Sequence, residues 1–270
     1  MSESHIMNYA KRFGGIARVY GDTGLDNLRA AHVCVIGLGG VGSWVAESLA
    51  RSGVGAITLI DMDVVAESNI NRQLVATDDQ IGRDKIAVMA QRIGHINPDC
   101  TVTCVDDFVS RENLDTLIQS SLDWVIDCID DFRTKAALIS YCRKNKIKIL
   151  TTGGAGGQID PSKVLLADLS NTEHDVLLAK TRKLLRQDYG FSKNLKRSFG
   201  IKTVYSKEQL NYPDGSGGLS PQRPKSSDSE ETLNGLNCAG GLGSITHVTA
   251  SFAMFAAAHV LNSIAASTKP

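Results

Sequence analysis

Short apolar runs alternate with longer stretches of helical period from residue 33 onward. The runs are rich in β-branched residues, and the stretches between them repeat apolar positions every three or four residues. Such alternation is typical of a Rossmann-like α/β fold, a mostly parallel sheet with helices on both faces. The predicted strands are 33–37, 56–61, 101–106, 123–130 and 147–152, and the predicted helices are 40–53, 85–93 and 133–145.

The alternation weakens beyond about residue 155. Two further predicted strands, 163–169 and 201–206, flank a charged helix over 174–190. Residues 211–236 are dominated by Pro, Gly, Ser and charged residues, so this segment is predicted to be a mobile loop. The C-terminal part is therefore an extension of the sheet that ends in one more helix.

That last helix is apolar throughout. Residues 239–268 contain no Asp, Glu, Lys or Arg, and the stretch is long enough to cross a bilayer. Its His, Asn, Ser, Thr and Gly residues oppose insertion, and its apolar residues recur at helical spacing. We therefore predict a helix that faces the protein core, with membrane association as the alternative. The predicted core-facing residues are Ile245, Val248, Phe252 and Phe255.

Composition and charge narrow the class of protein. Hydrophobic residues make up 42% of the chain and charged residues 21%, as in globular proteins, and we treat residues 1–270 as one domain with an N-terminal helical arm over 1–30. The formal net charge is zero, so a nucleic-acid partner would need a local basic patch. None of the six cysteines forms a CxxC pair, which argues against a zinc ribbon. The start of the chain shows no apolar stretch of signal-peptide length, which favours a cytoplasmic protein.

The stretch GLGGVG, residues 37–42, follows a predicted strand and opens a predicted helix. In that context the glycines let the backbone approach a phosphate, and the helix N-terminus offers N–H groups and a positive dipole end. Asp61 ends the next strand, where a carboxylate can accept hydrogen bonds from ribose hydroxyls. The motif predicts an adenine nucleotide and leaves NAD, FAD and ATP open. Its glycines are Gly37, Gly39, Gly40 and Gly42.

Two cations, Arg72 and Lys85, follow the second predicted strand in the segment that would overhang the nucleotide. They favour a triphosphate, because ATP carries more negative charge than the pyrophosphate of a dinucleotide. For an isolated lysine, a solvated surface charge is the usual explanation. Here the amide side chains of Asn69, Asn71 and Gln73 lie beside the arginine in sequence and would hold the loop in shape.

A second acidic element, DCIDDFR, ends the fourth predicted strand. The carboxyl ends of parallel strands form the edge of a sheet where ligands bind. Mg²⁺ takes one or two protein carboxylates together with phosphate oxygens and water, so a single well-placed aspartate suffices. We predict that Asp130 binds Mg²⁺. For Asp127 and Asp131, capping of the next helix is weighed equally with metal binding.

These motifs resemble those of the ubiquitin-activating-like superfamily, the adenylating enzymes of the HesA, MoeB and ThiF type. The matching stretches are GLGGVG, DMDVVAESNINRQ, Lys85 and the DCID turn, within residues 8–155. The resemblance implies ATP and Mg²⁺, a structural monovalent cation, and a homodimer in which an N-terminal arginine, Arg12 or else Arg18, reaches the partner's nucleotide. The catalytic residues that it implies are Arg12, Arg72, Lys85 and Asp130. The ATP-binding residues that it implies are the four glycines, Asp61, Asp63, Asn69, Asn71, Arg72, Gln73 and Lys85. Asp130 would bind the Mg²⁺ that accompanies ATP.

Residues 9–21, 150–161 and 237–252 are similar to the tRNA threonylcarbamoyladenosine dehydratase family within that superfamily. The resemblance implies ATP-dependent closure of the threonylcarbamoyl side chain next to the anticodon into a cyclic form. Transfer of AMP to the substrate carboxylate would give a mixed anhydride, and attack by an internal nitrogen or oxygen would expel AMP. Arg72, Lys85 and Mg²⁺ would stabilise the developing charge. Release of ADP and phosphate instead of AMP and pyrophosphate stays open.

A tRNA substrate should leave a local excess of positive charge in the sequence. Between residues 180 and 202, eight basic residues accompany a single acid, Asp188. We predict that Lys193, Lys196 and Arg197 bind tRNA, with a solvated helix face as the alternative. The neighbouring aromatic residues that would stack on bases are Tyr189, Phe191 and Phe199.

Cys238 is either an acceptor thiol, in keeping with the family's association with a cysteine desulfurase system, or a small residue beside a glycine turn. We favour the second role, because no basic residue lies near it in sequence to lower the pKa of its thiol.

Other functions stay open at this point. The main rival enzyme is an adenylating activator of a small ubiquitin-like sulfur carrier. An NAD-dependent oxidoreductase would leave Arg72, Lys85 and Asp130 unexplained, and a nucleotide-sensing scaffold would bind ATP without turnover.

Overall fold

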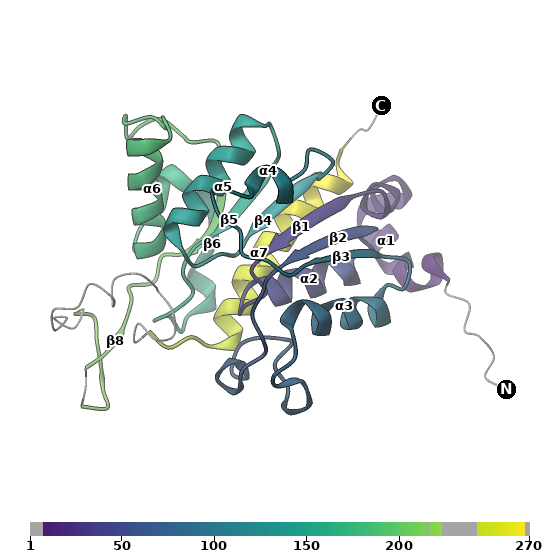
Figure 1. Cartoon of the computed structure of the whole chain (residues 1–270), viewed down its shortest axis with the longest axis horizontal. Helices are drawn as coiled ribbons and strands as arrows, with labels where there is room; N and C mark the ends of the chain where they lie inside the picture. Colours follow the sequence, from purple (N-terminus) through teal and green to yellow (C-terminus); the bar gives the residue numbers. More distant parts are fainter. Residues whose placement is uncertain (1–7, 215, 223–241, 268–270) are drawn as a thin grey trace.

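A seven-stranded sheet runs through the centre of the molecule in the computed structural model, which describes residues 8–214, 216–222 and 242–267 (Figure 1). Its strand order is β3-β2-β1-β4-β5-β7-β6. Every pair of neighbours is parallel except β6 with β7, which is antiparallel. The strands are β1 (His32–Ile36), β2 (Ala56–Ile60), β3 (Thr101–Val105), β4 (Trp124–Asp127), β5 (Ile149–Thr152), β6 (Val164–Asp168) and β7 (Lys202–Ser206).

Helices cover both faces of this sheet, and each face has its own buried apolar cluster. One face carries α1 (Tyr9–Arg29), α2 (Gly42–Arg51), α3 (Lys85–Ile96) and α7 (Thr246–Ala265). The other carries α4 (Leu114–Leu117), α5 (Phe132–Lys144) and α6 (Val176–Asp188). Short 3-10 turns lie in the connections: η1 (Glu67–Asn69), η2 (Asp78–Gln80), η3 (Pro161–Lys163) and η4 (Leu169–Asn171).

The predicted α/β architecture is confirmed, with the strands and helices where the periodicity places them. The central strands β1 and β4 are almost entirely buried because helices lie on both sides, which is why they read as continuous apolar runs. In the register of the sheet, Ile36 pairs with both Ile60 and Asp127. The carboxyl ends of β1, β2 and β4 are therefore level, and the loops that follow them meet at one edge.

The apolar C-terminal helix faces the core, as predicted. Val248 and Phe252 are fully buried, and the buried stripe continues through small alanines against α2 and α1. The prediction was wrong for Ile245 and Phe255, which are 40% and 43% exposed. A stripe at positions 248, 252 and 256 leaves residue 255 on the outer side of the helix. α7 passes a length and hydropathy test for a membrane span, but half of the tested window is buried inside the protein.

The N-terminal arm is helical, as predicted, and it packs along α7. The Tyr9 hydroxyl donates to the carbonyl of Gly53 (2.6 Å), and the Tyr20 hydroxyl donates to Asn262 Oδ1 (2.6 Å). A kink at Gly21, where φ is 76°, lets one helical segment follow two directions. α1 is therefore part of the fold and closes one end of the apolar cluster beneath the sheet.

The segment 211–236 was predicted to be a loop throughout. In the part of it that the structure describes, β8 (Tyr212–Pro213) and β9 (Leu219–Ser220) form a small antiparallel hairpin. Residues 223–241, which include Cys238, lie outside the described residues. In its described part, the segment thus contains a short hairpin where a loop was predicted.

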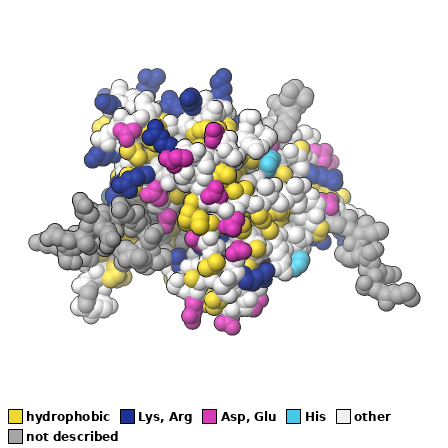
Figure 2. Space-filling model, in the orientation of Figure 1, with side chains coloured by type: hydrophobic (Ala, Val, Ile, Leu, Met, Phe, Trp, Pro, Cys, Tyr) yellow, Lys and Arg dark blue, Asp and Glu magenta, His cyan; other side chains and the backbone are white. Residues whose placement is uncertain are grey.

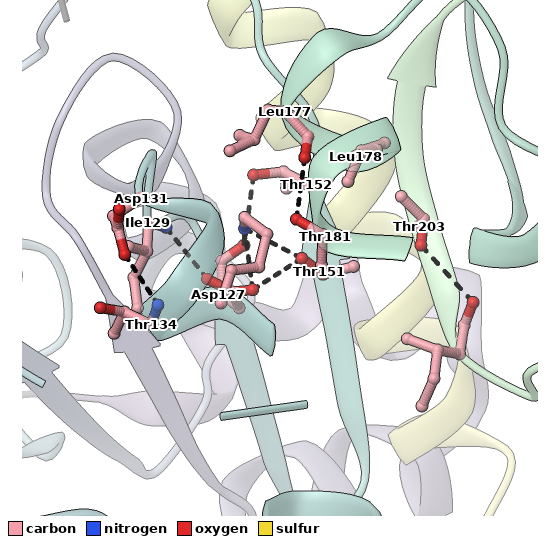
Figure 3. A network of polar contacts seen from close by, with 12 residues as sticks. Asp127, Ile129, Asp131, Thr134, Thr151, Thr152, Leu177, Leu178, Thr181 and Thr203 are labelled. Atoms are coloured by element: carbon pink, nitrogen blue, oxygen red, sulfur yellow. Dashed lines mark hydrogen bonds and ion pairs between the residues drawn. The ribbon is translucent and has the colours of Figure 1, made fainter. Parts of the chain in front are cut away.

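A buried ion pair ties the end of β4 to β5 and α5. Lys135 Nζ lies 2.8 Å from Asp127 Oδ2, and both side chains are fully buried. The same carboxylate oxygen accepts the Thr151 hydroxyl (2.6 Å), and Asp127 Oδ1 accepts the Ile129 amide (3.0 Å) (Figure 3). Lys135 also donates to Thr151 Oγ1 (3.0 Å), so every partner in the network is matched. The turn after β4 is thereby fixed relative to two neighbouring elements.

We expect Lys135→Met to lower the free energy of unfolding by about 3–5 kcal/mol, because it leaves the Asp127 carboxylate buried without its counter-ion. The double variant Asp127→Asn with Lys135→Met should lose less than Lys135→Met alone. Urea unfolding followed by circular dichroism measures both. Lys144→Met, an exposed change in the same helix, is the control and should stay within about 0.5 kcal/mol of wild type. A loss below about 1 kcal/mol for Lys135→Met would contradict the role assigned to the pair.

Candidate functional site

A cavity of about 730 Å³ opens at the carboxyl ends of β1, β2 and β4. β1 leads to β2 on one side, whereas β4 lies on its other side, so this is the point where the strand order reverses. Ligands of doubly wound α/β proteins bind at such a point. The site residues that line the cavity are Gly37, Gly39, Gly40, Asp61, Asp63, Asn69, Arg72, Gln73, Lys85 and Asp130.

The turn after β1 requires glycine at two positions for different reasons. Gly37 has a φ of 84°, and a Cβ there would lie 3.1 Å from the carbonyl oxygen of Cys128. A Cβ on Gly42 would overlap the carbonyl oxygen of Gly37, so only glycine lets α2 begin this close to the turn. No side chain caps α2 at Val41. Gly40 and Val41, directly before the helix, line the cavity, so the positive end of its dipole faces the cavity and is suited to an anion.

Asp61 lies on the cavity wall where the sequence predicts it. Its Oδ2 accepts the Leu38 amide (2.5 Å), and its Oδ1 accepts the Asp63 amide (2.8 Å). Burial raises the pKa of Asp61, and the nearby Lys85 ammonium and these backbone donors oppose that rise. The two amides fix the orientation of the carboxylate, which leaves its remaining lone pairs for ligand hydroxyls.

Arg72 lies directly over the glycine turn. A Cβ on Gly40 would come within 3.1 Å of Arg72 Cγ, so the absence of a side chain at Gly40 makes room for the arginine stem. The guanidinium donates to the Ser68 carbonyl (2.9 Å), and Trp44 Nε1 donates to the Arg72 carbonyl (3.1 Å). The arginine is thus held against the loop on which phosphates would lie.

Gln73 follows Arg72 and is buried, with its side chain beside Gly39. Among the residues that the structure describes, no hydrogen-bond partner reaches its Oε1. A buried amide oxygen without a partner costs about 1–3 kcal/mol. Because Gln73 lines the cavity, its oxygen is placed to accept a donor from a bound ligand.

Lys85 occupies the first turn of α3, where a cation opposes the helix dipole. Its side chain is 6% exposed, and its Nζ lies 2.7 Å from Asp63 Oδ2, whose own side chain is 57% exposed. A buried lysine at the unfavourable end of a helix is a poor choice for stability alone. Its position on the cavity wall indicates an anionic ligand, which would share the ammonium with Asp63.

The three aspartates at the end of β4 and in the turn that follows it take three different roles. Asp131 caps α5 by accepting the Thr134 amide (2.7 Å), which confirms the capping interpretation for that residue. Asp127 neither caps the helix nor faces the cavity as a metal ligand, because Lys135 holds it in the interior. Asp130 is exposed and lines the cavity. No group of three or more His, Cys, Asp or Glu residues gathers as a metal site within 8–214, 216–222 and 242–267.

Three residues predicted for the nucleotide site do not line the cavity. Gly42 packs against the glycine turn from behind. Asn71 donates to the Ser244 carbonyl (2.7 Å), so it holds the overhanging loop to the start of α7, the shape-keeping role predicted for it. Arg12 donates to the carbonyl of Ile96 (2.6 Å). Ile96 is the last residue of α3 and lies about 16 Å along the helix from Lys85, its first residue.

Basic side chains gather over α6 and the loop that follows it (Figure 2). Lys193, Lys196 and Arg197 are all exposed there, as a binding role requires. The predicted stacking of Phe191 and Phe199 on bases is wrong. These two rings are 3% and 5% exposed and pack edge to face at 5.0 Å between centroids, so they form the core of the loop.

The sequence did not point to Asp175, which lines the cavity from the start of α6. Its carboxylate accepts the amides of Leu178 (2.8 Å) and Gly154 (2.9 Å), and thereby joins α6 to the loop after β5. Burial raises its pKa to about 6. An aspartate directly before a helical pattern is a capping signal, but its contact with Gly154 depends on tertiary structure.

Cys128 is the cysteine that lines the cavity among the described residues. Burial raises the pKa of its thiol to about 12, so the thiol is protonated at neutral pH. A thiolate nucleophile is therefore not available from this residue. The chemistry of the cavity is consequently that of cations, amides and carboxylates.

The ThiF family profile matches residues 14–270. The chain is 50% identical over 261 residues to the tRNA threonylcarbamoyladenosine dehydratase of Haemophilus influenzae, a match that covers 97% of this chain and 96% of that protein. Crystal structures of Escherichia coli tRNA N6-threonylcarbamoyladenosine dehydratase, TcdA, in complex with ATP and with AMP each match with a TM-score of 0.82 and 47% identity over 94% of both chains. The chain therefore belongs to the ThiF family.

Proposed function

We propose that this chain is a tRNA threonylcarbamoyladenosine dehydratase, which uses ATP to cyclise the modified adenosine next to the anticodon. The observation that carries the proposal is the single cavity in which a glycine turn, Asp61 and Lys85 meet, in a chain that matches dehydratases almost end to end. The ATP complex of the similar E. coli enzyme supports ATP as the nucleotide. The rival activator of a sulfur carrier is less favoured, because this chain matches tRNA dehydratases over nearly its full length.

Each part of ATP, from the ribose to the phosphates, would have matching residues in the cavity. Asp61 would accept the ribose hydroxyls, and the glycine turn with the N-terminus of α2 would receive phosphate. Arg72 and Lys85 would neutralise the remaining phosphates and stabilise charge that develops on phosphorus and on the departing pyrophosphate. Gln73 Oε1 would gain the hydrogen bond that it lacks in the described structure.

Asp130 fits the requirement for Mg²⁺, since one exposed carboxylate on the cavity wall can act together with phosphate oxygens and water. A bound Mg²⁺ would supply further neutralisation of phosphate charge. The structural monovalent cation stays a prediction, with no residues assigned to it. The same holds for the sulfur-transfer partner, because Cys238 lies outside the described residues.

The proposed reaction balances as two displacements. A substrate carboxylate oxygen forms a bond to the α-phosphorus while the bond to pyrophosphate breaks. A nitrogen or oxygen of the same side chain then attacks the activated carbonyl carbon, loses its proton and expels AMP. The nucleic acid loses one water overall, and its oxygen leaves on AMP. If the γ-phosphoryl group were transferred instead, ADP and phosphate would be the products.

The proposal includes a cytoplasmic homodimer in which Arg12 contributes to the site of the partner. In its own chain, Arg12 lies at the far end of α3 from Lys85, so it would act only across an interface. Arg18 is the second candidate for this role.

Incubation of the protein with tRNA that carries threonylcarbamoyladenosine, ATP and Mg²⁺ should convert the nucleoside to a product lighter by one water. Mass spectrometry of the digested tRNA measures this change. The ratio of AMP to ADP formed identifies which phosphorus is attacked. Exchange of pyrophosphate into ATP that needs a small carrier protein and ignores tRNA would instead support the sulfur-carrier function.

Lys85→Met should weaken ATP binding at least tenfold, because a buried cation next to the phosphates contributes about 1.5–3 kcal/mol through charged hydrogen bonds. Isothermal titration calorimetry with ATP and Mg²⁺ measures the dissociation constant. Arg83→Met removes an exposed charge from the turn just before α3 and should change the dissociation constant less than twofold. Equal affinities for the two variants would argue that Lys85 has only its structural partner, Asp63.

Reversal of the exposed loop charges, in the triple variant Lys193→Glu, Lys196→Glu and Arg197→Glu, should weaken tRNA binding and flatten its dependence on salt. Each RNA phosphate that is no longer neutralised by the protein reduces the slope of log K against log salt by about 0.7–0.9. Filter binding over a range of salt concentrations measures the slope, with ATP affinity as the control. Unchanged tRNA affinity would remove this loop from the interface.

A further inference from the structure

A second cavity, of about 500 Å³, adjoins the nucleotide cavity along α6. The two cavities share Asp175, Val176 and Leu210 in their linings. One wall of the second cavity is the first half of α6, and the other is formed by the segment before β8, by β8 itself and by the residue after β9. The side chains on that second wall are Gln209, Leu210, Tyr212 and Pro221.

The face that α6 turns to this cavity follows from helical spacing. Val176, Ala179, Lys180 and Lys183 recur at intervals of three and four residues, so they lie along one side of the helix. Lys183 is exposed, and Lys180 is half-buried with its ammonium 5.3 Å from the centroid of the Phe132 ring. The two lysines are therefore held one turn apart on the wall of a cleft.

The charge of the second cavity is positive. Lys180, Arg182 and Lys183 are cationic, and His174 lies at the entrance to α6. Asp175 is the acid in this lining, and it is 5% exposed with its oxygens on two backbone amides. Arg182 donates a hydrogen bond to Thr172, and Lys180 and Lys183 add two further cations to the lining of the cleft. Such a cleft suits a chain of phosphates.

We propose that this second cavity binds the RNA backbone on one side of the modified adenosine, with phosphates on Lys180 and Lys183 while the adenosine enters the nucleotide cavity. The inference rests on the proposed tRNA substrate and adds the place where the RNA enters. The modified base must meet ATP in the nucleotide cavity, whereas the RNA backbone stays outside that cavity. Two cavities that share a wall allow both. Tyr212, half-buried opposite the lysines, provides a ring on which a neighbouring base stacks.

The loop with Lys193, Lys196 and Arg197 does not meet this need by itself. It follows the C-terminal end of α6, about 18 Å from Val176 at 1.5 Å per residue. Charges at that distance attract RNA without positioning the reacting group. The second cavity should therefore govern the Michaelis constant for tRNA more strongly than the distal loop does.

The test is the double variant Lys180→Glu with Lys183→Glu, assayed for conversion of the modified nucleoside at varied tRNA and saturating ATP. We expect the KM for tRNA to rise at least tenfold and the slope of log K against log salt to fall by about 1–2, as expected when two phosphates are no longer neutralised. ATP affinity should change less than twofold. Lys11→Glu with Lys144→Glu, two exposed lysines on other helices, gives the same change in net charge and should leave KM within twofold of wild type.

Two outcomes would overturn the inference. The first is a KM for tRNA in the Lys180 and Lys183 double variant equal to that of the charge-matched control. The second is a parallel loss of ATP affinity, which would assign the cleft to the phosphates of the nucleotide. If wild-type protein itself dehydrates no tRNA, the proposed function fails and the KM comparison is not reached, so the two failures are distinguishable.

A footprint on the wild-type protein tests the same inference without any variant. Acetylation of Lys180 and Lys183 by a water-soluble reagent, read by mass spectrometry, should fall at least threefold when an RNA stem-loop with the anticodon sequence is added. ATP with Mg²⁺, or inorganic phosphate at equal charge, should protect them less than the stem-loop does. Protection by ATP alone to the same extent as by RNA would contradict the assignment.

Discussion

The buried pair of Asp127 and Lys135 is the constraint on which the site depends. Its carboxylate and ammonium are inaccessible to water, so each requires the other, and together they fix the end of β4 against β5 and α5. The backbone directly after Asp127 carries the Cys128 carbonyl against which Gly37 packs. The same turn carries Asp130 to the cavity. The glycine turn and the acidic turn therefore keep their spacing because one ion pair in the interior holds it.

The two buried lysines of the sheet edge show how the fold separates structure from binding. Lys135 is paired with a carboxylate as buried as itself, and no ligand can compete for it. Lys85 is nearly as buried, but its partner Asp63 is largely exposed. Water already weakens the second pair, so exchange of Asp63 for a phosphate costs little. Both lysines are buried, so the burial of the partner carboxylate determines which of the two lysines can bind a ligand.

Local pattern was enough to predict the architecture and many of the residues that line the first cavity. The hydrophobic period and the β-branched runs predict the strands. The glycine turn and Asp61 can be recognised because they lie within a short span of sequence. The parts that it did not predict depend on contacts between distant segments. The pairing of Asp127, the burial of Phe191 and Phe199 and the link from Asp175 to Gly154 are fixed only when β5, α5 and α6 meet.

Asp175 connects the two cavities through the backbone. One of its oxygens holds the first turn of α6, and the other holds Gly154 in the loop after β5. A Cβ on Gly153 would overlap this carboxylate, so the glycine is needed for the loop to come this close. Because the loop lines the first cavity and α6 carries Lys180 and Lys183, the walls of the two cavities are joined by this carboxylate. If the two cavities bind the nucleotide and the RNA backbone as proposed, this one buried carboxylate would set the distance between the two ligands.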